Sequence, residues 1–389
     1  MFVATAVVCT LASSPYAQET APLHAYFRVL PLHGNSNPPG SARAAAAASV
    51  SSVPLWDYTG QFASRDGNTY GGTMVGRSPF FHGARTTNIN TILVPVKVTF
   101  QDTGTAFDPG KTDPICLPNG TVTATSLTQQ SPILMPANFT MNGVNEGSTQ
   151  YVDAFLRASF FEAVNPTGNS FHTLLNLTAT VTASTSIPAA SGGTYSVPCG
   201  HLGVMDVNAF DNIVQNTLLP ALASKGVGPA NIPIFLLYNV VMSDGPPNLG
   251  LTNCCILGYH SGITSPSKIQ LYSVADYDSS QAFGGTPSGN WDTAVLSHET
   301  DELINDPLGT NATPSWGHVG QVSGCQNNLE VGDPLSGTFF PPVTMLNGIT
   351  YDLQELAFYS WFFGSPSIGA GGKFSDNGTF TSDAGPICQ

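Results

Sequence analysis

One short segment of the chain brings together four side chains that can bind a metal ion or exchange protons. Residues 292–306 read DTAVLSHETDELIND, and the spacing of their apolar residues predicts a helix. At 100° per residue, His298, Glu299, Glu302 and Asp306 fall within an arc of roughly 100°. An imidazole and three carboxylates on one arc can serve as metal ligands or as general acids and bases. We expect the helix to bury its apolar arc and to present this polar arc to a cleft.

The segment that starts at His298 reads HExxE. In the related pattern HExxH, the residues at i and i+4 bind one zinc ion, and the glutamate after the first histidine polarises a water molecule. Glu302 occupies the second ligand position, so we predict His298 and Glu302 as metal ligands and Glu299 as the general base. A carboxylate makes the site harder and more anionic. A histidine with carboxylates still suits zinc, which is the first expectation, and it also suits manganese, iron or calcium as alternatives.

A third protein ligand has to come from outside this helix. Glu330 is the first candidate, because it lies downstream in the stretch LEVGDP with a second acid, Asp333, just beyond it. Asp333 would then support the site by orienting a ligand. His318, in the stretch WGHV, and Asp306 are alternative ligands.

The composition excludes several classes of protein. Only 36 of 389 residues are charged, 11 basic against 25 acidic, which gives a net charge of −14. This is 9%, where globular domains carry about 25%. No basic patch is available to bind nucleic acid, and no internal apolar run is long enough to span a membrane. The 41% of hydrophobic residues is enough for a globular core, and the low charge is typical of exported proteins.

Three regions are predicted along the chain. Residues 1–17 (MFVATAVVCTLASSPYA) are apolar and end in small residues, as in a secretory signal peptide. Residues 18–52 are rich in Pro, Ala and Ser and are read as a low-complexity linker or pro-segment. Residues 53–389 are expected to form a single domain with a β-rich N-terminal part. We therefore predict a secreted, extracellular protein.

Apolar periodicity gives the expected elements of this domain. Helices are predicted over 148–164, 207–224 and 292–306, the last with Asp292 as its N-cap. Strands are predicted over 92–100, 174–185, 232–242 and 268–275, with a hairpin over 343–353. A long Gly/Asn-rich loop is expected from 307 to about 337. The fold class is therefore α+β with long loops.

The cysteines fit an oxidising compartment. Removal of Cys9 with the signal peptide leaves six cysteines, an even number, as expected for disulfides. The sequence contains no C-x-x-C pair, so a cysteine-rich zinc site is not expected. Adjacent cysteines rarely bond to each other, so we expect Cys254 and Cys255 to pair with distant partners.

Two resemblances follow from these motifs. The sequence LSHETDELINDP at 296–307, followed by EVGD at 330–333, resembles secreted HExxE proteins of the zincin-type metallopeptidase class. The sequence CCILGYHSG at 254–262 more weakly resembles the plant phosphate-induced (EXORDIUM) family, which is extracellular. The zincin resemblance implies a twisted mixed sheet whose edge strand lies over an active-site cleft, with the HExxE helix beneath it.

Two functional hypotheses remain open. The first is a secreted metal-dependent hydrolase, most plausibly a zinc metallopeptidase that acts on polypeptides. The alternative is a non-catalytic extracellular protein of the phosphate-induced type, with a structural metal ion or none. His260 is a candidate to line the cleft, and Tyr259 or Tyr272 are candidates to stabilise an oxyanion.

Overall fold

The computed structural model describes most of the chain, namely residues 22–32, 55, 57–80, 84–118, 120–165, 170–265, 268–284, 286–287, 291–364, 369–385 and 388. It is a mixed α+β fold with a curled mixed sheet, as the sequence predicted. The signal peptide expected at 1–17 lies outside the described residues. Part of the expected linker or pro-segment, residues 22–32, is described and contributes a strand to the main sheet.

The main sheet has eleven strands: β1 (Tyr26–Val29), β4 (Ala84–Phe100), β5 (Ala106–Phe107), β8 (Ser170–Thr180), β9 (Ala183–Ile187), β10 (Gly192–Ser196), β11 (His201–Asp206), β12 (Ile232–Tyr238), β13 (Val240–Ser243), β14 (Cys254–Ser265) and β15 (Lys268–Tyr277). Their order is β10-β11-β13-β14-β15-β12-β4-β5, with β1 paired to β14 and with β8 and β9 paired to β4. Strand β12 runs parallel to both β15 and β4. Strand β14 runs antiparallel to β13 and β15 and parallel to β1.

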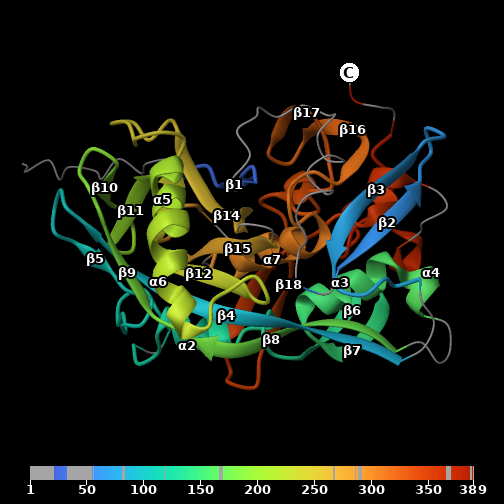
Figure 1. The fold of residues 1–389 in the computed structure, drawn as a ribbon, viewed down its shortest axis with the longest axis horizontal. Helices are drawn as coiled ribbons and strands as arrows, with labels where there is room; N and C mark the ends of the chain where they lie inside the picture. The colour runs from blue at the N-terminus through green and yellow to red at the C-terminus, as the bar shows by residue number, and fades with distance from the viewer. Residues whose placement is uncertain are drawn as a thin grey trace, which may run out of the picture.

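Both faces of the sheet are covered, which explains the continuous apolar run in β12. Its side chains alternate between two cores: Ile234 and Leu236 belong to one, Phe235 and Leu237 to the other. The second core is covered by α5 (Val207–Ile213), a π-helix (Val214–Leu218) and α6 (Leu219–Leu222). In Figure 1 these helices lie across the left half of the sheet.

The opposite face carries α7 (Ala294–Asn305), α3 (Tyr151–Ser159), α4 (Phe161–Val164) and α8 (Tyr359–Phe363). The helices expected over 148–164 and 207–224 are thus present, each divided into shorter pieces. The second ends at Gly226, whose left-handed φ of 93° is the conformation that glycine adopts readily. The remaining described helices are α2 (Ala124–Gln129) and short 3₁₀ turns.

Four two-stranded sheets surround the main one: β2 (Asp57–Ala63) with β3 (Thr69–Val75), β6 (Ala137–Met141) with β7 (Val144–Thr149), β16 (Ala312–Val319) with β17 (Val322–Asn328), and β18 (Phe339–Thr344) with β19 (Thr350–Gln354). The β18–β19 hairpin confirms the prediction for 343–353. The β16–β17 hairpin corrects the expectation of a plain loop before residue 337. In Figure 1 it lies at the top of the molecule, and β2–β3 at the right.

Helix α7 differs from its prediction in two respects. All twelve of its residues are buried, so its polar arc does not face an open cleft. Asp292 does not cap it: the helix begins after Thr293, and the Asp292 carboxylate accepts hydrogen bonds from the backbone N–H groups of Thr293 and Asp352. Gly258 of β14 allows this close packing, because a Cβ there would lie 2.7 Å from Glu299 Cγ.

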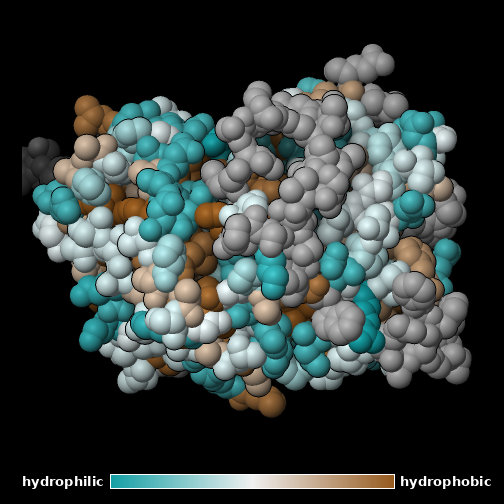
Figure 2. Space-filling view, viewed as in Figure 1, coloured by the Kyte–Doolittle hydropathy of each residue, from teal (hydrophilic) through white to brown (hydrophobic). Residues whose placement is uncertain are grey.

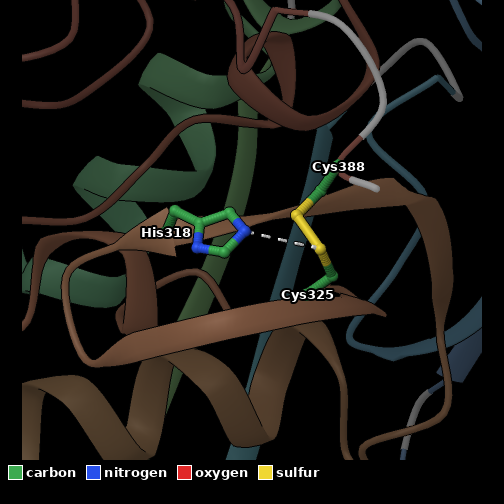
Figure 3. A group of neighbouring side chains, drawn as sticks. All are labelled: His318, Cys325 and Cys388. Atoms are coloured by element: carbon green, nitrogen blue, oxygen red, sulfur yellow. Dashed lines mark hydrogen bonds between the residues drawn. A yellow bond between two sulfur atoms is a disulfide. The ribbon is translucent and has the colours of Figure 1, made fainter.

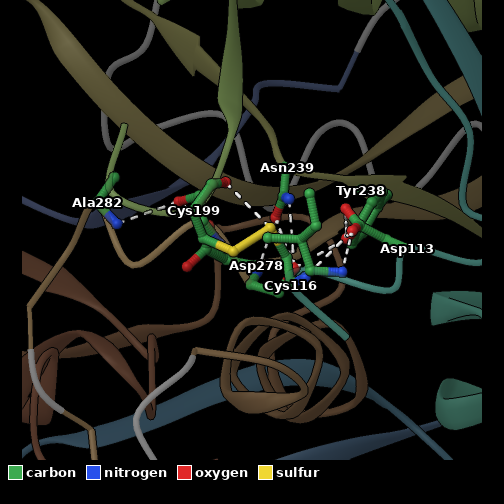
Figure 4. Close-up of a disulfide and its surroundings, with 10 residues drawn as sticks. Asp113, Cys116, Cys199, Tyr238, Asn239, Asp278 and Ala282 are labelled. Atoms are coloured by element: carbon green, nitrogen blue, oxygen red, sulfur yellow. Dashed lines mark hydrogen bonds between the residues drawn. A yellow bond between two sulfur atoms is a disulfide. The ribbon is translucent and has the colours of Figure 1, made fainter. Parts of the chain in front are cut away.

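Three disulfides are formed within the described residues. Cys116–Cys199 lies beside Tyr238, Asn239 and Asp278, near the end of β12 (Figure 4). Cys325–Cys388 ties β17 to the C-terminal segment. The third joins Cys254 to Cys255, so the expectation of distant partners for these two is wrong. The peptide bond between them is cis.

Few large apolar side chains are exposed in the described part of the chain. On the face in Figure 2, brown residues alternate with pale and teal ones. The large apolar side chains that are exposed among the described residues are Phe80, Ile115, Met135, Leu249 and Leu346. No helix in the described parts of the chain is long and apolar enough to cross a membrane.

Candidate metal centre

Three segments that are distant in sequence bring six ionisable side chains together in the interior. Helix α7 lies against β14 and β15, and the stretch after β17 lies against the end of α7. All six residues are buried, the most exposed at 7%: His260 from β14, His298, Glu299 and Glu302 from α7, and Glu330 and Asp333 from the stretch after β17.

The first half of the cluster surrounds His298. Its Nε2 lies 2.9 Å from Glu302 Oε2 and 3.7 Å from Asp333 Oδ1. The other oxygen of Glu302 accepts hydrogen bonds from the backbone N–H groups of Gly332 and Asp333, at 3.0 and 3.2 Å. Gly332 has to be glycine for this arrangement, because a Cβ at that position would overlap the His298 ring. Glu302 is therefore held from two sides.

The second half surrounds His260. Its Nδ1 lies 3.3 Å from Glu299 Oε2 and 3.9 Å from Glu302 Oε2. Its Nε2 lies 3.9 Å from Glu330 Oε2 and 3.1 Å from the backbone carbonyl oxygen of Asp306. The potential ligand atoms of His260, Glu299 and Glu302 all lie within 4.8 Å of one another, as do those of His298, Glu302 and Asp333. Glu302 is common to both sets and is the centre of the cluster.

Amide side chains orient the outer carboxylates. Asn328 donates to Glu330 Oε1 at 3.0 Å. Gln321 donates to Asp333 Oδ1, and Gln326 donates to Asp333 Oδ2 at 3.0 Å. Both oxygens of Asp333 are thus occupied. Glu330 Oε2 and Glu299 Oε1, in contrast, receive no hydrogen bond although both are buried. These two oxygens are available to an additional ligand.

The charges of the cluster do not balance. Among the described residues, the ion pairs to these carboxylates come from histidine alone. Burial raises the pKa of Glu299 and of Glu330 well above the usual range, and repulsion by Glu302 adds to it. Burial likewise raises the pKa of Asp333 to about 7. A buried group of carboxylates has to be protonated or has to bind a cation.

The two histidines respond differently to burial. Burial lowers the pKa of His260 to about 4, so this ring is neutral and able to act as a ligand or to accept a proton. Burial also opposes the charge on His298, but the attraction of Glu302 prevails and the pKa of His298 is raised. Burial opposes the charge on Glu302 too, and the attraction of His298 lowers its pKa. Without a metal ion, His298 and Glu302 therefore form an ion pair.

A divalent cation fits this set of donors. Carboxylate oxygens and imidazole nitrogens are the ligands of zinc, manganese and iron sites in proteins. The unpartnered oxygens of Glu299 and Glu330 and the excess of carboxylates over imidazoles are both features that a cation would neutralise.

Two of the predicted alternative ligands lie elsewhere. His318 is exposed on the β16–β17 hairpin, with its Nε2 3.9 Å from Cys325 Sγ (Figure 3). Since Cys325 is bonded to Cys388, these sulfurs are not thiolate ligands. The carboxylate of Asp306 accepts hydrogen bonds from the backbone N–H groups of Thr310, Asn311 and Leu329. Asp306 therefore has a structural role at the end of α7.

Tyr259 and Tyr272 are also outside the cluster. Side chains alternate along a strand, so Tyr259 points away from the face that carries its neighbour His260. Both tyrosines belong to the core under α5 and α6, and the Tyr272 hydroxyl donates to Asp211 at 2.6 Å. They cannot stabilise an oxyanion at this site.

Two neighbours of the cluster did not follow from the sequence. The ring of Phe27, from β1, stacks on that of His298 with a centroid separation of 3.8 Å and an interplanar angle of 18°. The side chain of Gln321, at the tip of the β16–β17 hairpin, connects Asp333 to the main chain of Phe27. Phe27 is 271 positions from His298 and 294 positions from Gln321, and no local pattern encodes either contact.

Comparison with known proteins gives no relative: no protein-family model, curated protein or solved structure matches this chain.

Proposed function

We propose that this protein is a secreted metal-dependent hydrolase, with zinc as the first expected metal, that acts on polypeptides. The observation that carries the proposal is the buried cluster centred on Glu302, in which carboxylates outnumber imidazoles and two oxygens lack any partner. Manganese, iron or calcium would suit the same donors. The resemblance of the HExxE segment to zincin-type proteins supports the same reading.

His298, Glu302 and Glu330 are the proposed ligands. Glu330 is favoured over Asp333 because Glu330 Oε2 has no hydrogen-bond donor, whereas both oxygens of Asp333 are held by Gln321 and Gln326. Asp333 then takes the supporting role, since it lies within 3.7 Å of His298 Nε2 without a free oxygen.

Glu299 is the proposed general base. A bound zinc ion would act as a Lewis acid and lower the pKa of a water molecule. The raised pKa of Glu299, caused first by burial, suits a group that takes a proton from water and passes it to a leaving amine. The neutral His260, 3.3 Å from Glu299 Oε2, orients that carboxyl group.

The burial of the whole cluster favours a second candidate function. His298 lies under Phe27, and the described side chains of the cluster leave no open path to it. A non-catalytic extracellular protein, in which the same residues hold a structural ion, would need no access to solvent. This second candidate corresponds to the weaker resemblance to the plant phosphate-induced family.

Metal analysis of the purified protein separates these possibilities. We expect close to one equivalent of a divalent metal, its loss in His298→Ala, and its retention in His318→Ala, the matched histidine outside the cluster. A metal content below about a tenth of an equivalent would refute the metal site.

Catalysis needs its own test on metal-loaded protein. Glu299→Gln should keep the metal and lose the hydrolysis of an unfolded polypeptide, because it removes the base and keeps the shape. Hydrolysis that persists in Glu299→Gln would refute the mechanism. Full metal content, together with metal-dependent stability and no turnover in the wild type, would establish the structural-ion alternative.

A further inference from the structure

The N-terminal segment of the described chain lies between β14 and the Gln321 side chain, beside the cluster, and the space that it fills is called the groove below. Strand β13 pairs with only the first residues of β14, Cys254 and Ile256. Beyond them the same edge of β14 is taken by β1, with Phe27 opposite Gly258 and Val29 opposite His260. The part of β14 that carries His260 is therefore paired on this side by a segment from the N-terminal part of the chain.

Hydrogen bonds to the main chain extend this pairing beyond both ends of β1. The N–H of Leu30 donates to the carbonyl oxygen of His260 at 3.0 Å, and the Ser261 hydroxyl donates to the carbonyl oxygen of Leu30 at 3.1 Å. The N–H of Cys255 donates to the carbonyl oxygen of His24 at 3.1 Å. The segment is held as an extended peptide over at least seven residues, from His24 to Leu30.

The opposite wall of the groove binds the peptide backbone through one side chain. Gln321 accepts from the N–H of Phe27 at 2.8 Å and donates to its carbonyl oxygen at 3.0 Å. An amide side chain that satisfies both polar groups of one residue recognises backbone and is indifferent to sequence. The Gln321 oxygen is itself held by the Ser336 hydroxyl at 3.1 Å, and its nitrogen also donates to Asp333.

The side chain of Phe27 supplies the specific contact. It is 2% exposed and stacks on His298, with Trp291 at a centroid separation of 6.3 Å. The next residue, Arg28, contrasts with it: it points outward and pairs with Asp244, and both of these side chains are partly exposed. An aromatic anchor in a pocket between two backbone-binding walls is the arrangement by which proteins bind extended peptides.

We propose that the groove between β14 and Gln321 binds an extended polypeptide with an aromatic anchor over His298, and that residues 22–32 fill it in cis and keep the metal centre closed. Displacement of this segment leaves an unpaired edge on β14 and uncovers His298. The binding of the segment stands on the contacts above, whereas its role in regulating the centre rests on the proposed function.

The test uses the full chain with a site-specific protease sequence inserted between Ala46 and Ala47 and with a dye near the N-terminus. After folding and cleavage, we expect the N-terminal piece to co-elute with the rest of the protein. An excess of the synthetic peptide PLHAYFRVLPL, residues 22–32, should displace it.

Two variant peptides make the comparison specific. The peptide with Phe27→Ala should need at least about a tenfold higher concentration for displacement, because it loses the buried ring. The peptide with Arg28→Ala should stay within about threefold of the parent, since it loses only an exposed ion pair. Separation of the N-terminal piece immediately on cleavage, or equal potency of the two variant peptides, would overturn the proposal.

Metal exchange tests the regulatory part separately. We expect a chelator to remove the metal at least about tenfold faster after displacement than from the uncleaved chain, since a cover over a buried site slows access. Equal rates would refute closure of the centre by the segment but not the groove. If neither form holds a metal, the proposed function fails, and the displacement result still decides whether the groove binds a peptide.

Discussion

Glu330→Gln should weaken the stabilisation by metal without lowering the stability of the metal-free protein. The side chain keeps its shape, and its remaining oxygen can still accept the hydrogen bond from Asn328 that Glu330 Oε1 accepts now. The substituted atom is Oε2, which accepts no hydrogen bond, and the new amide can replace the protonated carboxyl as the donor to Glu302. Any loss of stability in the presence of metal therefore reports the loss of a ligand and not the loss of an internal hydrogen bond.

Without metal, the variant should be at least as stable as the wild type. Burial raises the pKa of Glu330, and repulsion by Glu302, Asp306 and Asp333 raises it further. A raised pKa means that the charged form is disfavoured in the folded state, so this carboxyl lowers stability above its unfolded pKa of about 4.3. The neutral amide removes that effect.

With metal, the variant should gain less stability than the wild type, and the size of the difference follows from linkage. At a free metal concentration of about 100 times the wild-type Kd, binding adds about 2.7 kcal/mol to the free energy of unfolding. Loss of a ligand should weaken binding by at least about 10- to 100-fold, the range known for outer-shell partners. The same metal concentration then adds only about 0.4 to 1.4 kcal/mol to the variant. We expect the variant to lose about 1.3 to 2.3 kcal/mol of metal-dependent stabilisation.

Urea unfolding of both proteins, in a chelator and in metal, measures this difference. Asp278→Asn is the matched control: Asp278 is buried, also has an oxygen without a partner, and lies outside the cluster. Its metal-dependent stabilisation should equal that of the wild type. Equal metal stabilisation in Glu330→Gln and in the wild type would remove Glu330 from the ligands and leave Asp333 as the third one.

Three further predictions concern the support of the site and of the fold. Gly332→Ala should abolish metal binding, because its Cβ would overlap the histidine ring of α7; Gly324→Ala, which has open space around it, should bind normally in the same titration. Replacing Cys116 and Cys199 by serine should lower the free energy of unfolding by about 2–5 kcal/mol, since the disulfide closes a loop of 83 residues; denaturant unfolding tests this. Burial raises the pKa of Asp278 to about 6, so its proton is bound more tightly in the folded state and stability should fall as the pH rises from about 4 to about 6. Urea unfolding at pH 4 and 7 should show that Asp278→Asn removes about 2 kcal/mol of this fall, and an unchanged pH dependence would contradict the prediction.

The three predicted helices and the parts of the main sheet that fall in β4, β8, β12 and β15 were predictable because they are encoded locally. Strands β1, β5, β10, β11 and β14 were not predicted. The apolar run of β12 and the 3.6-residue period of α3 and α7 each specify an element without reference to the rest of the chain. The helical spacing of His298, Glu299 and Glu302 also placed these three side chains at one site, as the distances around Glu302 show.

Long-range packing could not be predicted in the same way. The β16–β17 hairpin carries mostly polar residues that are exposed or half-buried, so it lacks the apolar alternation by which strands are recognised. Burial of the polar arc of α7 depends on Gly258 of β14, which lets the helix approach the sheet. The stacking of Phe27 on His298 depends on the pairing of β1 with β14, which no local pattern indicates.

His260 brings a second imidazole to the cluster that we propose as a metal centre. Relative to HExxH, the α7 motif replaces an imidazole by the carboxylate of Glu302 and so adds a negative charge to a buried site. The fold compensates in two ways. Two backbone N–H groups donate to Glu302 Oε1, and β14 supplies His260 3.9 Å from Glu302 Oε2. The imidazole that is absent from the helix is thus present on the strand that faces it, and the cluster again contains two histidines. Since burial keeps His260 neutral, it can donate electrons to a cation but cannot neutralise the carboxylates by itself. The remaining negative charge is what a divalent cation would balance, and this is the physical reason to test the centre for metal before any other ligand.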